Sequence, residues 1–177
     1  MLVEVRVQSL GLDRSTNTPV VVLQECGGGR VLPIWIGPGE ASAIAMHLAS
    51  MEFARPLTHD LMVSVLKGLG GTVQKVLITR VENSTYYAEV IIQRNGHVFS
   101  LDARPSDSIA LALRVDARIY AQESLLEHAS VEIAEDEPAL DAPPVPAEPD
   151  TPEAMGPEEL KEHLRRLNPE DFGRFTP

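Results

Sequence analysis

Hydrophobic and polar residues alternate at the start of the chain, as they do in a strand with one buried face. Val3, Val5 and Val7 alternate with polar residues over positions 2–10. Two further strands are expected at 20–25 and 30–37, each preceded by a stretch with turn residues. Proline cannot donate a ladder hydrogen bond, so Pro33 favours a sheet edge or a bulge for the third strand. These segments predict an antiparallel meander.

The spacing of the apolar residues then changes from that of a strand to that of a helix. Apolar residues at helical spacing predict a first helix over 40–51 and a second over 61–69, which Gly70 and Gly71 end. A third helix is expected over 108–115. The residues expected on the packed faces of the first two helices are Ala41, Ile44, Ala45, Leu48, Leu61, Val65, Leu66 and Leu69.

Three more strands are expected at 72–81, 84–93 and 97–103. Asn95-Gly96 between the last two is a strong signal for a two-residue hairpin turn. A short strand over 118–121 and a helix over 123–129 close the domain. Because strands come in runs and helices are grouped, the sequence predicts a compact α+β domain over residues 1–130, with a mainly antiparallel sheet.

The remainder of the chain has a different composition. Residues 131–157 are rich in proline, alanine and acidic residues, so they predict a disordered acidic linker. Residues 158–177 return to helical periodicity and predict a short amphipathic C-terminal segment, with Leu160, Leu164 and Leu167 on one face. So short a helix is marginal alone, and it either docks on a protein partner or is a tail without a role.

Charge and cysteine content narrow the possible functions. Of the formal net charge of −11, residues 131–177 carry −9 and residues 1–130 only −2. This balance argues against a protein that coats DNA by bulk electrostatics, but it does not exclude an enzyme that holds one or two phosphates in a cleft. Cys26 is the only cysteine, which excludes a disulfide framework. No apolar run is long enough to cross a bilayer, so a cytoplasmic protein without a membrane partner is expected.

An Arg-Pro motif occurs twice, each time just before a predicted helix. The first reads ARPLTHD (54–60) and the second DARPSD (102–107). One interpretation is structural: Thr58 and Ser106 are favoured N-caps, and Asp60 and Asp107 suit the positive end of a helix dipole. The other is functional, because helix N-termini and adjacent arginines also bind phosphate. The pattern by itself leaves both open.

Under the functional interpretation the two motifs form one site if the fold brings them together. Carboxylates are suited to Mg²⁺ or Mn²⁺, and a divalent ion can assist phosphodiester cleavage. Histidine titrates near neutral pH and suits a general base or acid. The candidate catalytic residues are Glu40, His59, Asp60, Asp102 and Asp107, of which Asp60, Asp102 and Asp107 are the candidate metal ligands. The candidate phosphate-binding residues are Arg55, Thr58, Arg104 and Ser106.

Three long stretches resemble the bifunctional nuclease family. They are LPIWIGPGEASAIA, RPLTHDLMVSVLKGLG and DARPSDSIALALRVDARIY, within a match from Met1 to about Glu127. The resemblance implies a compact α+β domain, nuclease activity on DNA and RNA helped by divalent metal, and dimers or higher homo-oligomers. The matching motif positions are Glu40, Arg55, Pro56, Thr58, His59, Asp60, Asp102, Arg104, Pro105, Ser106 and Asp107.

Two hypotheses follow. The first is a nuclease that hydrolyses phosphodiester bonds of DNA and RNA with little sequence preference. The second is a non-catalytic oligomeric binding or adaptor module, in which the Arg-Pro motifs only hold the fold and residues 158–177 recruit a protein partner.

Overall fold

A computed structural model describes residues 1–13 and 16–135 of the chain. Most of the predicted linker, and all of the predicted C-terminal segment, lie outside the described residues. The strands are β1 (Leu2–Asp13), β2 (Thr18–Glu25), β3 (Val31–Trp35), β4 (Thr72–Glu82), β5 (Thr85–Arg94), β6 (His97–Ala103) and β7 (Arg118–Gln122). The helices are α1 (Pro38–Leu48), α2 (Thr58–Gly68), α3 (Pro105–Val115) and α4 (Glu123–Glu135).

The seven strands form one sheet in the order β3-β2-β1-β7-β4-β5-β6. Two antiparallel meanders, β1–β3 and β4–β6, are joined by β7, which runs antiparallel to β1 and parallel to β4. The predicted α+β class with a mainly antiparallel sheet is therefore confirmed. β3 is an edge strand, as Pro33 indicated, and β6 is the edge at the other end.

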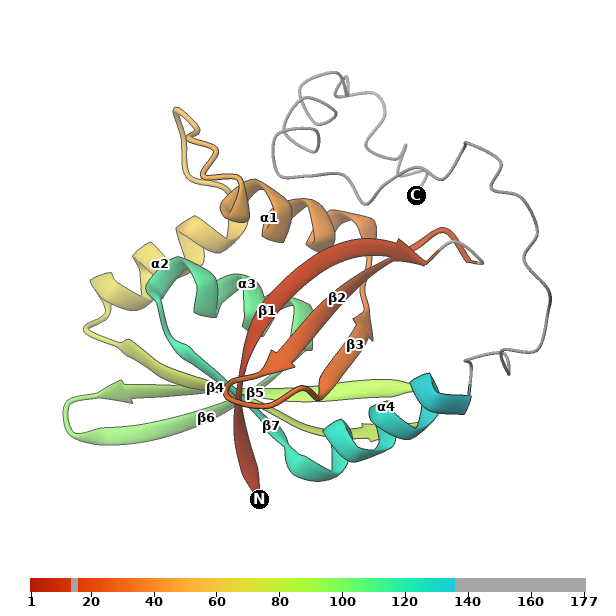
Figure 1. Ribbon diagram of the computed structural model, residues 1–177. Helices are drawn as coiled ribbons and strands as arrows, with labels where there is room; N and C mark the ends of the chain where they lie inside the picture. The colour runs from red at the N-terminus through yellow and green to blue at the C-terminus, as the bar shows by residue number, and fades with distance from the viewer. Residues whose placement is uncertain (14–15, 136–177) are drawn as a thin grey trace.

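Helices α1, α2 and α3 gather together on the sheet, and α4 lies apart from them against β3 and β7 (Figure 1). The central helix is α3, which contacts both α1 and α2 and packs on β4 and β5. Its residues Ile109, Ala110, Leu111 and Ala112 are all buried. α3 begins directly after β6, so its first turn lies at the end of this edge strand, and both α1 and α2 contact α3. Among the described residues no helix is long and apolar enough to span a membrane.

The N-cap predictions were wrong by one or two positions. Thr58 is the first residue of α2 and Leu57 is its N-cap. Ser106 is the second residue of α3, which Arg104 caps and Pro105 begins. Proline is well placed at the first helical position, because its φ is already helical and the N–H it lacks would have no partner there. The Asp60 carboxylate accepts the Leu57 N–H at 2.9 Å, so Asp60 caps the N-terminus of α2.

The predicted packed face of α2 was also largely wrong. Leu61, Val65 and Leu69 are more than half exposed, whereas His59 and Val63 are buried. Apolar residues occupy more than one side of this helix, so periodicity did not identify the side that packs against α3. On α1, Ala41, Ile44 and Ala45 are buried as expected, but Leu48 is exposed. Finally, α4 continues to Glu135, past the expected domain boundary at residue 130.

Candidate functional site

A cleft of about 1060 Å³ opens between α1, α2, α3 and the β5–β6 hairpin. Its apolar lining includes Met46 of α1, Met62 and Leu66 of α2, and Val90, Ile92 and Leu101 of the sheet. Its polar lining includes Glu40, Thr58, His59, Arg104 and Asp107. The cleft therefore draws residues from both Arg-Pro motifs, although they are far apart in the sequence.

A histidine–carboxylate pair joins the two motifs. His59 Nε2 lies 3.1 Å from Asp107 Oδ1. A carboxylate only accepts hydrogen bonds, so Nε2 carries the proton and the lone pair of a neutral imidazole is on Nδ1. No hydrogen bond engages Nδ1, and no unpaired side-chain nitrogen or oxygen among the described residues is sealed from solvent. His59 lines the cleft but is only 8 % exposed, and its Nδ1 makes no hydrogen bond within the part of the chain that the structure describes.

Arg104 completes this cluster. Its Nε donates to Asp107 Oδ2 at 2.7 Å, and its Nη1 lies 2.8 Å from Glu40 Oε1. Its side chain is 66 % exposed, so the rest of the guanidinium is open to a ligand. Burial alone would raise the pKa of Asp107, but hydrogen bonds from Arg104 and His59 outweigh it and hold that pKa below its usual value. The hydrogen bond to Asp107 raises the pKa of Arg104.

Asp60 lies outside the cleft lining and pairs with Arg114. Its Oδ1 accepts Arg114 Nε at 2.5 Å. Arg114 also donates to the carbonyl oxygens of Ala43 at 3.2 Å and Ala110 at 2.9 Å, which ties α1, α2 and α3 together. The hydrogen bond from Arg114 lowers the pKa of Asp60, against the opposing effect of burial. The position of Asp60 is that of a structural residue.

Asp102 lines the cleft, but its side chain belongs to the other face of the sheet. It pairs with Glu89 across β5 and β6, while its neighbour Leu101 pairs with Val90. Successive side chains of a strand point to opposite faces. Leu101 and Val90 face the cleft, so the Asp102 carboxylate points away from it, on the face where Ser100 donates to Glu89 at 2.6 Å.

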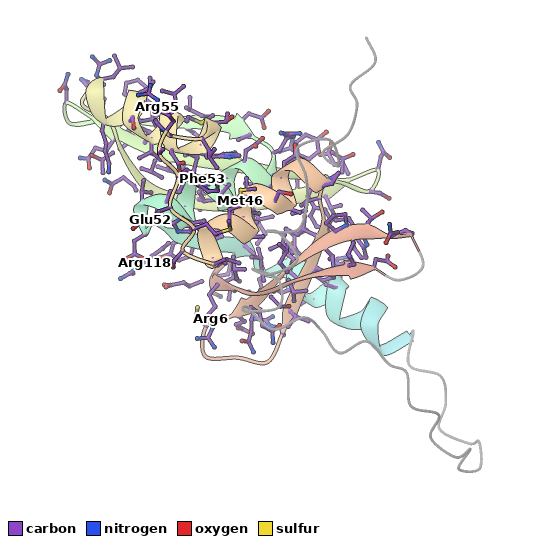
Figure 2. The ribbon with its side chains drawn as sticks, turned by 90° about the horizontal axis from the view of Figure 1, so that it is seen from above. Arg6, Met46, Glu52, Phe53, Arg55 and Arg118 are labelled. Carbon is purple, nitrogen blue, oxygen red and sulfur yellow. The ribbon has the colours of Figure 1, made fainter. Side chains whose placement is uncertain are left out.

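Of the other candidate phosphate-binding residues, one lies in the cleft wall and two do not. Thr58 is exposed in the cleft wall. Ser106 is buried in the first turn of α3 and is not part of the lining. Arg55 is exposed on the connection between α1 and α2, outside the lining, near Phe53 (Figure 2).

The predicted metal set of Asp60, Asp102 and Asp107 does not converge. Asp60 pairs with Arg114, Asp102 faces away, and both oxygens of Asp107 accept hydrogen bonds. Nowhere in residues 1–13 and 16–135 do three histidine, cysteine, aspartate or glutamate side chains group so that they can hold a metal ion. As arranged, these residues do not fit a bound divalent ion.

Sequence reasoning missed Arg114, whose side chain is only 6 % exposed. The available signal was an arginine directly after the apolar run Ile109–Leu113, because arginine is rarely buried without a partner. It also missed Met62, and it predicted Leu66 for the packed face of the helix rather than for the cleft. Because they follow His59 by three and seven residues, they lie on its side of α2.

The fold and the cleft define an α+β domain in which acidic, imidazole and guanidinium groups converge beside an apolar surface. The bifunctional nuclease domain matches residues 21–134, and the chain belongs to this family. An uncharacterized protein of Mycobacterium tuberculosis is 40 % identical over 171 residues, which cover 96 % of this chain and 97 % of that protein.

Two plant relatives are more distant. Bifunctional nuclease 1 of Arabidopsis thaliana is 25 % identical over 116 residues, which cover 64 % of this chain and 36 % of the plant protein. Bifunctional nuclease 2 of the same plant is 26 % identical over 112 residues, which cover 62 % and 34 %. This chain thus corresponds to about a third of each plant protein.

Proposed function

We propose that this protein is a nuclease that hydrolyses phosphodiester bonds of DNA and RNA, with His59 as the general base. The observation that carries the proposal is the pair of His59 and Asp107 at 3.1 Å in the wall of the cleft, which leaves Nδ1 of the imidazole without a hydrogen bond among the described residues. A base held in one tautomer by a carboxylate is a recurring arrangement in hydrolytic sites. Family membership and the names of the plant relatives support the same class of reaction.

The roles follow from the contacts. Nδ1 of His59 takes a proton from a water molecule as its oxygen attacks phosphorus, the bond from phosphorus to the leaving oxygen breaks, and that oxygen takes a proton from solvent. Asp107 is a positioning residue that fixes the tautomer and stabilises the imidazolium. The open part of the Arg104 guanidinium contacts the phosphate, where negative charge develops. Water as nucleophile makes the 2′-hydroxyl unnecessary, so the same site serves DNA and RNA.

The proposal is tested by His59→Gln in the full chain, assayed on fluorescent DNA and RNA oligonucleotides. Loss of a general base is expected to lower kcat/KM by about 10²–10⁴-fold. Asp107→Asn is expected to lower kcat with a smaller effect on KM, because it leaves the imidazole in the wrong tautomer.

Asp60→Asn is the matched control. It removes a carboxylate of the same motif as His59, but outside the cleft, and should leave kcat/KM unchanged below its unfolding temperature. The His59→Gln preparation also reports any contaminating nuclease. Folded His59→Gln with wild-type kcat/KM would exclude the proposed mechanism.

An oligomeric binding module is the second candidate, and one observation favours it. Leu61, Val65 and Leu69 recur at four-residue intervals and form an exposed apolar stripe along α2. A second copy of the chain is the occupant in this proposal. Val65→Glu is expected to lower the sedimentation coefficient to that of a monomer, whereas the already polar Ser64→Glu should not. A wild-type chain that sediments as a monomer at all concentrations would contradict it.

A further inference from the structure

One face of the β5–β6 hairpin runs from the cleft to the tip of the hairpin. Val90 and Ile92 of β5 line the cleft, and they pair with Leu101 and Phe99 of β6, so all four side chains share one face. Arg94 and His97 are the next pair on that face, at the tip of the hairpin. We refer to Leu101, Phe99 and His97 of β6, together with Arg94 at the end of β5, as the β6 track.

The β6 track has the chemistry of a single-strand binding surface. Phe99 is 48 % exposed, which is unusual for an aromatic ring beside a core. The Arg94 side chain has no hydrogen-bond or salt-bridge partner among the described residues. The side chains of Arg30, Arg80 and Arg118, in contrast, each pair with a glutamate. An aromatic ring for base stacking, followed by an unpaired cation for phosphate, is the combination that such surfaces use.

The turn and the strand pairing of the hairpin set the positions of these groups. Asn95 and Gly96 both have positive φ (51° and 78°), which confirms the predicted two-residue turn. From Ala103, beside Arg104, to His97 the strand spans about 20 Å at about 3.4 Å per residue. This length accommodates several nucleotides of a single strand.

We infer that the β6 track binds single-stranded nucleic acid, stacks a base on Phe99, and leads the strand to the Arg104–Asp107–His59 cluster. This inference rests on the proposed nuclease function. A duplex is disfavoured, because its bases are covered by their neighbours and the nearly neutral domain has few free cations for two backbones. Recognition thus depends on unpaired bases more than on bulk charge.

The test measures binding of fluorescein-labelled dT12 and of a 12-base-pair duplex to the full chain by fluorescence anisotropy at 4 °C, with a gel to confirm that the probes stay intact. Phe99→Leu keeps an apolar side chain but removes the ring. We expect it to weaken dT12 binding about 5- to 150-fold and to leave the weaker duplex binding unchanged, while Phe99→Trp retains affinity.

Arg94→Gln should weaken binding of all single strands alike and reduce the slope of log K against log salt by about 0.7. Val98→Ala is the matched control: Val98 is 66 % exposed on the same strand but faces the other way, and dT12 binding should not change.

The inference is overturned if Phe99→Leu binds dT12 like wild type, or if it loses dT12 and duplex equally. It is also overturned if Phe99→Leu loses binding only in parallel with a change in sedimentation coefficient, because the face is then an interface between two copies. The two proposals fail separately. If cleavage needs His59 but not Phe99, the nuclease proposal stands and the β6-track proposal fails. If binding needs Phe99 but no cleavage is detected, the β6-track proposal stands and the nuclease proposal fails.

Discussion

Replacing Asp60 by asparagine separates structure from catalysis in the first Arg-Pro motif. Asparagine keeps an oxygen for the Leu57 N–H but removes the negative charge that faces Arg114. The Arg114 side chain is 6 % exposed, so its guanidinium becomes a buried cation that retains only the carbonyl oxygens of Ala43 and Ala110. We expect α1, α2 and α3 to lose part of their mutual attachment.

The magnitude lies between two limits. Removing one partner of a fully buried ion pair costs about 3–5 kcal/mol, and an exposed pair contributes about 0–1 kcal/mol. Arg114 is as buried as in the first case, but the Asp60 side chain is 37 % exposed, so water screens its charge. We therefore expect Asp60→Asn to lower the free energy of unfolding by about 2 kcal/mol, which for a domain of this size lowers Tm by about 6–10 °C.

Thermal unfolding followed by circular dichroism measures this change. The control is Glu82→Gln, which breaks the Arg80–Glu82 pair at 2.8 Å, where both side chains are at least half exposed, and should leave Tm unchanged. An unchanged Tm for Asp60→Asn would refute the structural assignment of the Arg114 pair. An unchanged Tm together with lost cleavage would make Asp60 a catalytic residue after all.

Three further predictions follow. The pKa values of Asp60 and Asp107 are lowered in the folded state, so their stabilisation is present above the unfolded-state pKa of about 3.9 and is lost as pH falls through the folded-state values; urea unfolding should show stability falling below about pH 4, less steeply for Asp60→Asn. Because the described residues, 1–13 and 16–135, assemble no ligand set, Mn²⁺ should bind the substrate-free domain more weakly than about 1 mM by calorimetry, since Mg²⁺-type ions often rely on one or two carboxylates plus substrate phosphates; a micromolar site in this domain would contradict this. Gly96→Ala should destabilise the chain by about 1 kcal/mol, because Gly96 has a φ of 78°, whereas Gly68→Ala, in helix α2 with open space around it, should not destabilise it.

The elements and their order were largely readable from local pattern. Alternation located the strands, Asn95-Gly96 located the hairpin turn, and the Arg-Pro motifs marked the starts of α2 and α3. These signals are local, because the twofold period of a strand, the positive φ of a turn and the fit of proline at a helix start depend on a few neighbouring residues.

What the tertiary structure decided is the use of each charged side chain. The two motifs carry similar residues, yet Asp107 meets His59 in the cleft while Asp60 meets Arg114 between helices. Asp102, close to Asp107 in sequence, faces the other side of the sheet. The partner of a carboxylate depends on which distant segment packs against it and on the phase of the strand that carries it. Neither is encoded in the spacing of one motif. The sequence determined that a helix follows each Arg-Pro motif, and the packing of α1, α2 and α3 determined which acids share a site.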